Sequence, residues 1–405
     1  MSQKFLHHNQ KRAAEKLADI YKENNYAILM AQMQSGKTMS ALWTAVLLGD
    51  EIKNVYIISG DSQTYLQHQW MNDIKNLKSN GYGQDLTWHV CFRNNLQYID
   101  SDIKNSLFIW DESHTAQTSG QSLDYFYKRL QIQINGETGS LKRRGLYMLS
   151  ISATPISEIT CNITQCQNKQ MVFLKTPSLY RGVEYFYKND YIQPSFPIEE
   201  RDQLERLLTN HLHKGYFIMR IRNTRKFNME QYIKPIAKDI GFKTIVCSSK
   251  RGADTNDLEF MTNEPNGPTL ILIFGKFRMG QRIHKTYLTG MFEHSNSMKS
   301  DTALQGLLGR SCGYHKHNFF IYMPIHIIEK TIPEFLQFVK TRGKSGISNA
   351  MNTGSISPDS PVEYFPNTNG KEIFSNTNSV KPLTICTNLI EINYCSYGQF
   401  YECVY

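Results

Sequence analysis

The sequence lacks the features that mark membrane or exported proteins. It contains no uninterrupted apolar stretch of about 18 residues, so we expect no transmembrane helix and no membrane partner. Residues 1–16 are polar and charged and carry no signal-peptide core. We therefore expect the protein to act in the cytoplasm.

The cysteines lack the spacing of metal ligands. The sequence has eight cysteines and no C-x-x-C pair. Cys161 and Cys166 are separated by four residues, and Cys386, Cys395 and Cys403 lie near the C-terminus. This scatter favours free thiols in a reducing compartment over a metal site.

Acidic residues are fewer than basic residues. The 45 lysines and arginines exceed the 36 aspartates and glutamates by a formal +9, which permits a polyanionic partner without requiring one. A hydrophobic content of 40% and a charged content of 20% are typical of a folded, soluble protein. Because 405 residues are too many for one ordinary core, we expect two domains and an extension.

An apolar run that stops at two adjacent carboxylates is the most informative stretch present. Residues 107–110 are apolar, and Asp111 and Glu112 follow directly. This pattern predicts a buried parallel strand with an acidic carboxyl end, the edge where open α/β sheets bind ligands. Asp111 could hold Mg²⁺, and Glu112 could orient or deprotonate a water. For an isolated pair of carboxylates, an exposed acidic turn would be the simpler interpretation. The other motifs in the sequence therefore decide between this turn and a metal-binding role.

A second stretch has the setting of a phosphate-binding loop. Residues 26–30 indicate a short strand, residues 39–48 indicate a helix, and Gln34-Ser35-Gly36-Lys37-Thr38 lies between them. In such a loop the backbone N–H groups and the helix dipole cradle phosphates, the lysine neutralises them, and the threonine hydroxyl reaches Mg²⁺.

Strands and helices alternate along most of the chain. Further strands are predicted at 55–59, 87–92, 146–151, 216–221, 244–247, 269–274 and 319–323, and helices at 10–21, 199–213, 229–240 and 332–339. This alternation predicts an α/β protein with two parallel sheets. We place the domains at 1–185 and 186–344. Residues 345–405 are expected to be a poorly ordered linker and a small aromatic-rich extension, either a hairpin that docks on the second domain or an incomplete module that could bind a protein partner.

In their order and spacing, four motifs resemble those of superfamily 2 helicases of the D-E-x-H type, over roughly residues 5–340. They are the loop at 31–38, Asp111-Glu112-Ser113-His114, Ser152-Ala153-Thr154, and Gly309-Arg310. The resemblance implies two tandem RecA-like domains, ATP and Mg²⁺ as cofactors, and ATP hydrolysis coupled to movement along nucleic acid or its unwinding. We favour DNA over RNA. Residues 305–314 look most like helicases of phages and large DNA viruses, which would place the protein in the cytoplasm or nucleus of a host cell.

The resemblance also implies a role for each motif residue. The catalytic residues would be Lys37, Asp111, Glu112 and Arg310. The nucleotide would contact Gln10, Gln34, Ser35, Gly36, Lys37, Thr38, Gly280 and Arg310. Mg²⁺ would be held by Thr38 and Asp111. Coupling to strand movement would involve His114, Ser152 and Thr154. Nucleic acid would contact Ser59, Gly60, Gln63, Arg93, Arg220, Lys276 and Arg278. For the basic and amide side chains among them, a solvated surface position is at least as good an interpretation; they are Gln63, Arg93, Arg220, Lys276 and Arg278.

Ala31 stands in place of the first glycine of the general phosphate-loop pattern G-x-x-x-x-G-K-[ST]. Three positions depart from the pattern of those helicases. Gln34 replaces the usual first glycine of the inner loop, and Gly313 replaces the second arginine of the finger motif. Gln305 lies one residue further from Gly309 than usual. Arg310 would then be the only finger from its helix, with Arg278 or Arg282 as substitutes.

Two other functions compete with the helicase. One is a nucleotide switch that remodels a protein partner, and the other is the motor subunit of a restriction or repair complex. The S-A-T motif and Gly309-Arg310 favour the helicase, because a nucleotide switch would need neither. No nuclease signature is recognisable in the sequence, so a nuclease would have to be a partner chain.

Overall fold

The computed structural model describes most of the first 342 residues and two residues near the C-terminus. The described ranges are 6–59, 64–111, 122–131, 139–155, 169–222, 227–248, 253–255, 257–274, 282–294, 304–342 and 401–402. The chain divides into two compact units, one formed by Met1–Pro177 with Phe338–Tyr405 and the other by Ser178–Gln337.

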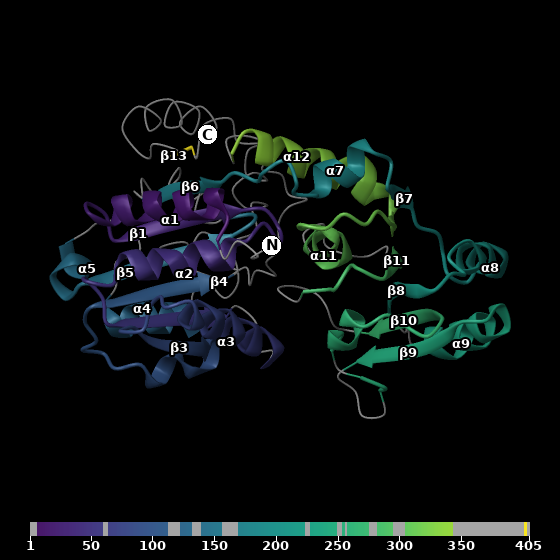
Figure 1. The fold of residues 1–405 in the computed structure, drawn as a ribbon, viewed down its shortest axis with the longest axis horizontal. Coiled ribbons are helices and arrows are strands. Elements are labelled where there is room, and N and C mark those ends of the chain that lie inside the picture. The colour runs from purple at the N-terminus through teal and green to yellow at the C-terminus, as the bar shows by residue number, and fades with distance from the viewer. Residues whose placement is uncertain are drawn as a thin grey trace, which may run out of the picture. The chain divides into compact units, whose positions relative to one another are not determined.

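The first unit is built on a parallel sheet with the strand order β13-β6-β1-β5-β4-β2-β3 (Figure 1). The strands are β1 (Tyr26–Ala31), β2 (Asn54–Ser59), β3 (Thr87–Phe92), β4 (Ser106–Asp111), β5 (Leu146–Ser152), β6 (Gln170–Leu174) and β13 (Tyr401–Glu402). The helices are α1 (His8–Tyr21), α2 (Lys37–Leu47), α3 (Thr64–Ser79), η1 (Arg93–Tyr98), α4 (Ser122–Leu130) and α5 (Gly139–Arg144).

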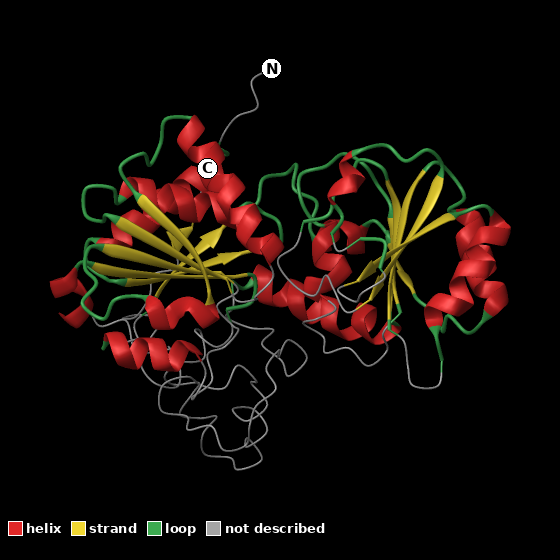
Figure 2. Ribbon diagram, turned by 90° about the horizontal axis from the view of Figure 1, so that it is seen from below, coloured by secondary structure: helices red, strands yellow, loops and turns green. Residues whose placement is uncertain are grey.

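Helices cover both faces of this sheet (Figure 2). Side chains of α1, α2 and α3 form one core with alternate residues of the strands, such as Leu29, Ile57 and Ile109. On the opposite face, the ring of Phe108 in β4 lies 5.3 Å from that of Phe126 in α4. Burial on both faces explains why β1, β4 and β5 are almost continuously apolar instead of alternating.

The second unit contains another all-parallel sheet, with the order β7-β12-β11-β8-β10-β9 (Figure 1). Its strands are β7 (Ile192–Pro194), β8 (Gly215–Ile221), β9 (Lys243–Ser248), β10 (Pro268–Phe274), β11 (Leu288–Glu293) and β12 (Phe320–Met323). Its helices are α7 (Val183–Lys188), α8 (Arg201–Asn210), α9 (Met229–Ile240), η2 (Glu259–Thr262), η3 (Leu304–Leu308), α11 (Gly309–Ser311) and η4 (Ile327–Thr331). Helix α12 (Ile332–Lys340) begins in this unit and continues past its last residue.

Helices α8 and α9 pack on one face of the second sheet, where Leu207 and Ile233 join Phe217 and Leu270 in a single core. The expected pair of parallel α/β sheets is thus confirmed. The predicted domain limits stay predictions. Of the expected C-terminal extension, the structure describes only β13, which pairs with β6 of the first unit and not with the second sheet. Among the described residues, no helix is both long and apolar enough to cross a membrane.

His211, at the end of α8, is a buried titratable group in the second core. Its side chain is 4% exposed, its ring centroid lies 4.5 Å from that of Phe217, and its Nε2 is 3.1 Å from the Tyr322 hydroxyl. Burial, assisted by the nearby His213, lowers the pKa of His211 from 6.5 to about 4. The folded protein therefore holds this imidazole neutral under conditions in which the unfolded chain protonates it.

This lowered pKa predicts a loss of stability in mild acid. Between pH 6.5 and 4 the unfolded state binds a proton that the folded state does not, so the free energy of unfolding falls as the pH falls, by about 3 kcal/mol at most. The variant His211→Gln should show a shallower dependence over this range. Urea unfolding followed by circular dichroism at pH 7.5, 5.5 and 4.5 checks it. Identical slopes for both proteins would show that His211 does not carry the effect.

Candidate nucleotide-binding site

The predicted phosphate loop connects β1 to α2 and is closed by its own hydrogen bonds. The Ser35 hydroxyl and the Ser35 N–H donate to the Gln32 carbonyl at 2.7 and 3.1 Å. Gln34 and Gly36 have left-handed backbones, with φ of 55° and 99°. Gln34 therefore occupies a position that suits glycine, at a cost of roughly 1–2 kcal/mol for a side chain. The loop keeps the turn of a phosphate loop although this glycine is absent.

Gln10 packs directly against this loop. Its Oε1 accepts a hydrogen bond from the His7 N–H at 2.9 Å, and its Nε2 lies 3.5 Å from the Gly36 carbonyl. A Cβ added to Gly36 would lie only 1.9 Å from Gln10 Nε2, and with a φ of 99° at Gly36 a side chain there would also strain the backbone. The structure thus brings Gln10 and the loop together. Recognition of adenine by Gln10 stays a prediction.

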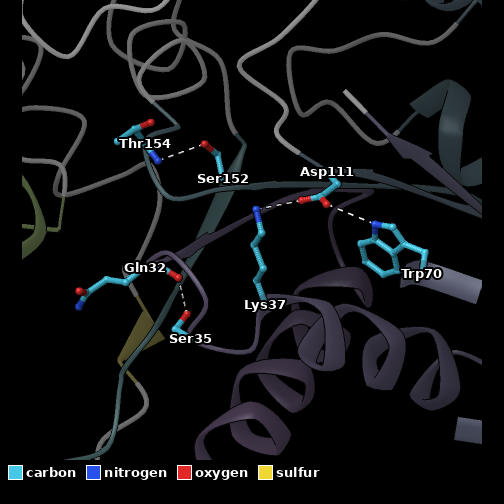
Figure 3. Close-up of polar contacts among 7 residues, drawn as sticks. All are labelled: Gln32, Ser35, Lys37, Trp70, Asp111, Ser152 and Thr154. Carbon is cyan, nitrogen blue, oxygen red and sulfur yellow. Dashed lines mark hydrogen bonds and ion pairs between the residues drawn. The ribbon is translucent and has the colours of Figure 1, made fainter. Parts of the chain in front are cut away.

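Lys37 and Asp111 meet although their motifs are far apart in the sequence (Figure 3). Lys37 Nζ lies 3.0 Å from Asp111 Oδ1, and both side chains are largely buried. Asp111 ends β4, where it pairs with Ser59 of β2 and Ile151 of β5. Its other oxygen, Oδ2, accepts a hydrogen bond from the indole N–H of Trp70 at 3.2 Å. The structure thus brings the two motifs together at the carboxyl edge of the sheet.

The residues at this edge suit a magnesium–nucleotide complex. Thr38 is buried in the first turn of α2, and its hydroxyl and the Asp111 carboxylate are the hard oxygen ligands that Mg²⁺ prefers. The loop and the N-terminus of α2 offer backbone N–H groups and a positive dipole to phosphates. The Lys37–Asp111 pair provides the cation for a phosphate and the anion for a metal. Assignment of these ligands stays a prediction.

The Ser152-Ala153-Thr154 segment lies at the end of β5, between β1 and β4 in the sheet. Both hydroxyl side chains are buried, and the Thr154 N–H donates to Ser152 Oγ at 3.1 Å (Figure 3). Strand β5 therefore lies between β1, which leads into the predicted phosphate loop, and β4, which ends at Asp111. Its coupling role stays a prediction.

Arg310 lies in the second unit, in the short helix α11, and is 4% exposed. The charge of Arg310 bears on the pKa values of two other buried groups, Lys285 and Cys312. Burial lowers the pKa of the Lys285 ammonium to about 7, and the positive charges of Arg310 and Arg282 add to this effect. Burial also raises the pKa of the Cys312 thiol to about 11. The role of Arg310 as an arginine finger stays a prediction.

Arg220, a predicted nucleic-acid contact, has a different environment. Its Nε donates to Glu293 Oε2 at 2.6 Å, and the two side chains are 6% and 1% exposed. The pair joins β8 to β11, and a Cβ on Gly306 would lie 2.5 Å from Arg220 Nη2. Breaking a buried ion pair typically costs about 3–5 kcal/mol. This arrangement gives Arg220 a structural role, and our proposal for the nucleic-acid surface does not include it.

Several predicted site residues lie outside the part of the chain that the structure describes. They are Gly60, Gln63, Glu112, His114, Lys276, Arg278 and Gly280, and the side chain of Arg93. Ser59 is described: it ends β2, is buried, and pairs with Asp111 in the sheet. Its contact with nucleic acid stays a prediction. Trp70 is the site residue that sequence reasoning missed, because its spacing in α3 indicates only a core position.

The comparisons with known proteins agree with this fold. The chain matches no protein-family model. It is 24% identical over 361 residues to uncharacterized protein L594 of Acanthamoeba polyphaga mimivirus, covering 79% of this chain and 86% of that protein. Helicase Lhr of Mycobacterium smegmatis, whose structure contains single-stranded DNA and AMP-PNP, is similar with a TM-score of 0.50, 12% identity, and coverage of 83% of this chain and 48% of Lhr. The DEAH/RHA helicase HrpB of Escherichia coli is similar with a TM-score of 0.50, 11% identity, and coverage of 77% and 42%.

These likenesses show the fold. The chain consists of two tandem RecA-like domains. It spans less than half the length of the two helicase chains that it matches.

Proposed function

We propose that this protein is an ATP-driven helicase or translocase, which couples ATP hydrolysis to movement along nucleic acid or to its unwinding. The observation that carries the proposal is the 3.0 Å contact between Lys37 Nζ and Asp111 Oδ1. This contact joins the phosphate-neutralising group of one motif to the metal-binding group of another, at the edge of a parallel sheet where ligands bind. Lys37 follows a loop that leads into a helix N-terminus, where backbone N–H groups and the helix dipole favour phosphate, and this placement supports the proposal.

Each residue of this edge has a part in the proposed reaction. The loop amides and Lys37 bind the phosphates, Thr38 and Asp111 hold Mg²⁺, and Glu112 orients and deprotonates the attacking water. Bound Mg²⁺ would neutralise the phosphate oxygens. Arg310 from the second unit would stabilise the charge that develops on the γ-phosphate. His114, Ser152 and Thr154 would couple this step to the nucleic acid, as the resemblance to the D-E-x-H type implies.

Nucleic acid is the proposed partner. The structure of the similar helicase Lhr contains single-stranded DNA, which supports a nucleic-acid strand as the substrate, and we favour DNA over RNA. The candidate contacts are Ser59, Gly60, Gln63, Arg93, Lys276 and Arg278. The mimivirus relative supports a viral origin, which would place the activity in a host cell.

ATP hydrolysis by the full chain, measured with and without nucleic acid, tests this function. We expect Mg²⁺-dependent hydrolysis that single-stranded DNA accelerates at least ~10-fold, within the usual range of coupling between two sites. Hydrolysis that neither DNA nor RNA accelerates would favour the nucleotide switch. The absence of any hydrolysis would refute the proposal. Strand displacement on tailed DNA and RNA duplexes then separates unwinding from translocation and identifies the preferred strand.

A further inference from the structure

The Asp111 carboxylate is held from two sides by residues of different elements (Figure 3). Lys37, at the start of α2, contacts Oδ1 at 3.0 Å. Trp70, in α3, donates its indole N–H to Oδ2 at 3.2 Å. The two donors differ in kind, because the ammonium carries a charge and the indole does not.

The packing of α3 explains how Trp70 reaches the carboxylate. Leu66, Trp70, Ile74 and Leu77 are its buried apolar residues, and their spacing of three and four places them on one face of the helix. The Trp70 ring packs in the same core as Ile57 and Ile109 and is 2% exposed. A tryptophan in such a place has one polar atom to satisfy, and here its partner is the carboxylate at the end of β4.

We propose that Trp70 is a positioning residue for the metal-binding carboxylate. The inference rests on the proposed ATPase function. Rotation of an aspartate about its last torsion is broad, so the carboxylate needs partners to hold one orientation. The indole N–H holds Oδ2, so Oδ1 faces Lys37. Oδ1 would be the oxygen that binds Mg²⁺ when the nucleotide is bound. When Lys37 turns to the phosphates, Trp70 keeps this orientation without adding a positive charge beside the metal.

The expected effect follows from the behaviour of groups that orient metal ligands. Removal of such a partner typically costs about 10–100-fold in metal affinity or activity. Trp70 acts on the carboxylate and not on the phosphate loop, so its N–H should matter for Mg²⁺ and not for nucleotide alone. A tryptophan that only fills the core would change the stability of the unit and leave the dependence on Mg²⁺ unaltered.

The variant Trp70→Phe tests this in the full chain. Affinity for a fluorescent ATP analogue is titrated against Mg²⁺ and measured separately in EDTA. We expect the half-saturating Mg²⁺ concentration to rise at least ~10-fold, and the affinity in EDTA to stay within about twofold of the wild type. ATP turnover at limiting Mg²⁺ should fall in parallel and recover as Mg²⁺ is raised.

Trp88→Phe is the matched control. The Trp88 indole N–H donates to the Gly83 carbonyl at 3.1 Å, and Trp88 lies at the amino end of β3, whereas Asp111 lies at the carboxyl end of β4. This variant loses the same kind of hydrogen bond in the same unit, so its Mg²⁺ dependence should match the wild type. An equal shift in both variants, or no shift in Trp70→Phe, overturns the proposal.

Misfolding of Trp70→Phe and failure of the proposed function can each be distinguished from failure of the Trp70 proposal. If Trp70→Phe does not fold, benzothienylalanine at position 70 replaces the N–H by sulfur with almost no change of shape, and the same shift in Mg²⁺ dependence is expected. A wild-type dependence in that protein overturns the proposal. If the wild-type chain itself binds no nucleotide with Mg²⁺, the proposed function fails, and the role of Trp70 fails with it.

Discussion

Lys37→Ala is expected to lower ATP turnover by roughly 10³-fold or more, because the phosphate loop loses the ammonium that neutralises the phosphates. Loss of a single uncharged donor to a developing charge already costs about 10²–10³-fold, and a buried cation contributes more. Lys37 is largely buried and contacts Asp111 at 3.0 Å, so its charge acts where water screens little. Turnover at saturating ATP and Mg²⁺ measures the loss.

The fold should survive this substitution, since Asp111 keeps its hydrogen bond from Trp70. Lys22→Ala is the matched control: it removes another lysine–aspartate pair, with Asp19 at 2.8 Å, but from the exposed surface of the same unit. It should leave turnover unchanged. Wild-type turnover in Lys37→Ala would refute the phosphate-loop assignment.

Glu112→Gln should bind Mg²⁺-ATP and hydrolyse it at least ~100-fold more slowly, the usual contribution of a positioned base.

Arg310→Ala should lower turnover by roughly 10³-fold while nucleotide affinity changes only a few fold, which is the pattern of an arginine finger. Gly313 occupies the position of the usual companion arginine, so Arg310 would be the only guanidinium that this motif supplies. Arg310 is 4% exposed, so its charge would act where water screens little.

The controls separate a catalytic loss from unfolding. Arg310→Lys keeps the charge in the core of the unit, and Arg201→Ala removes an exposed arginine that pairs with Glu205 in α8. Thermal unfolding should place Arg201→Ala and Arg310→Lys near the wild type, and only the Arg310 variants should lose turnover. Arg278→Ala and Arg282→Ala test the two substitutes. A loss below about tenfold at all three arginines would mean that the second unit supplies no finger, and the nucleotide switch would become the better interpretation.

The fold class, and the sheet edge at which Asp111 lies, could be predicted from the sequence. Strands buried on both faces leave continuous apolar runs, and such runs are visible without coordinates, as in β4 before Asp111. Because parallel strands all end at one edge of their sheet, a strand that leads into Lys37 and a strand that ends at Asp111 place both residues at that edge. Both inferences use information that lies within a few neighbouring residues.

The tertiary structure decided the partners of individual side chains. Arg220 lies in an otherwise apolar strand, and only the structure shows that it pairs with Glu293, 73 positions away, because β8 and β11 are neighbours in the sheet. The spacing of apolar residues in α3 indicates only a core position for Trp70. Its hydrogen bond to Asp111, 41 positions away, depends on how α3 lies against β4. Composition and periodicity report which face of an element is buried, whereas a hydrogen bond between distant residues depends on strand order and helix packing, which no local pattern contains.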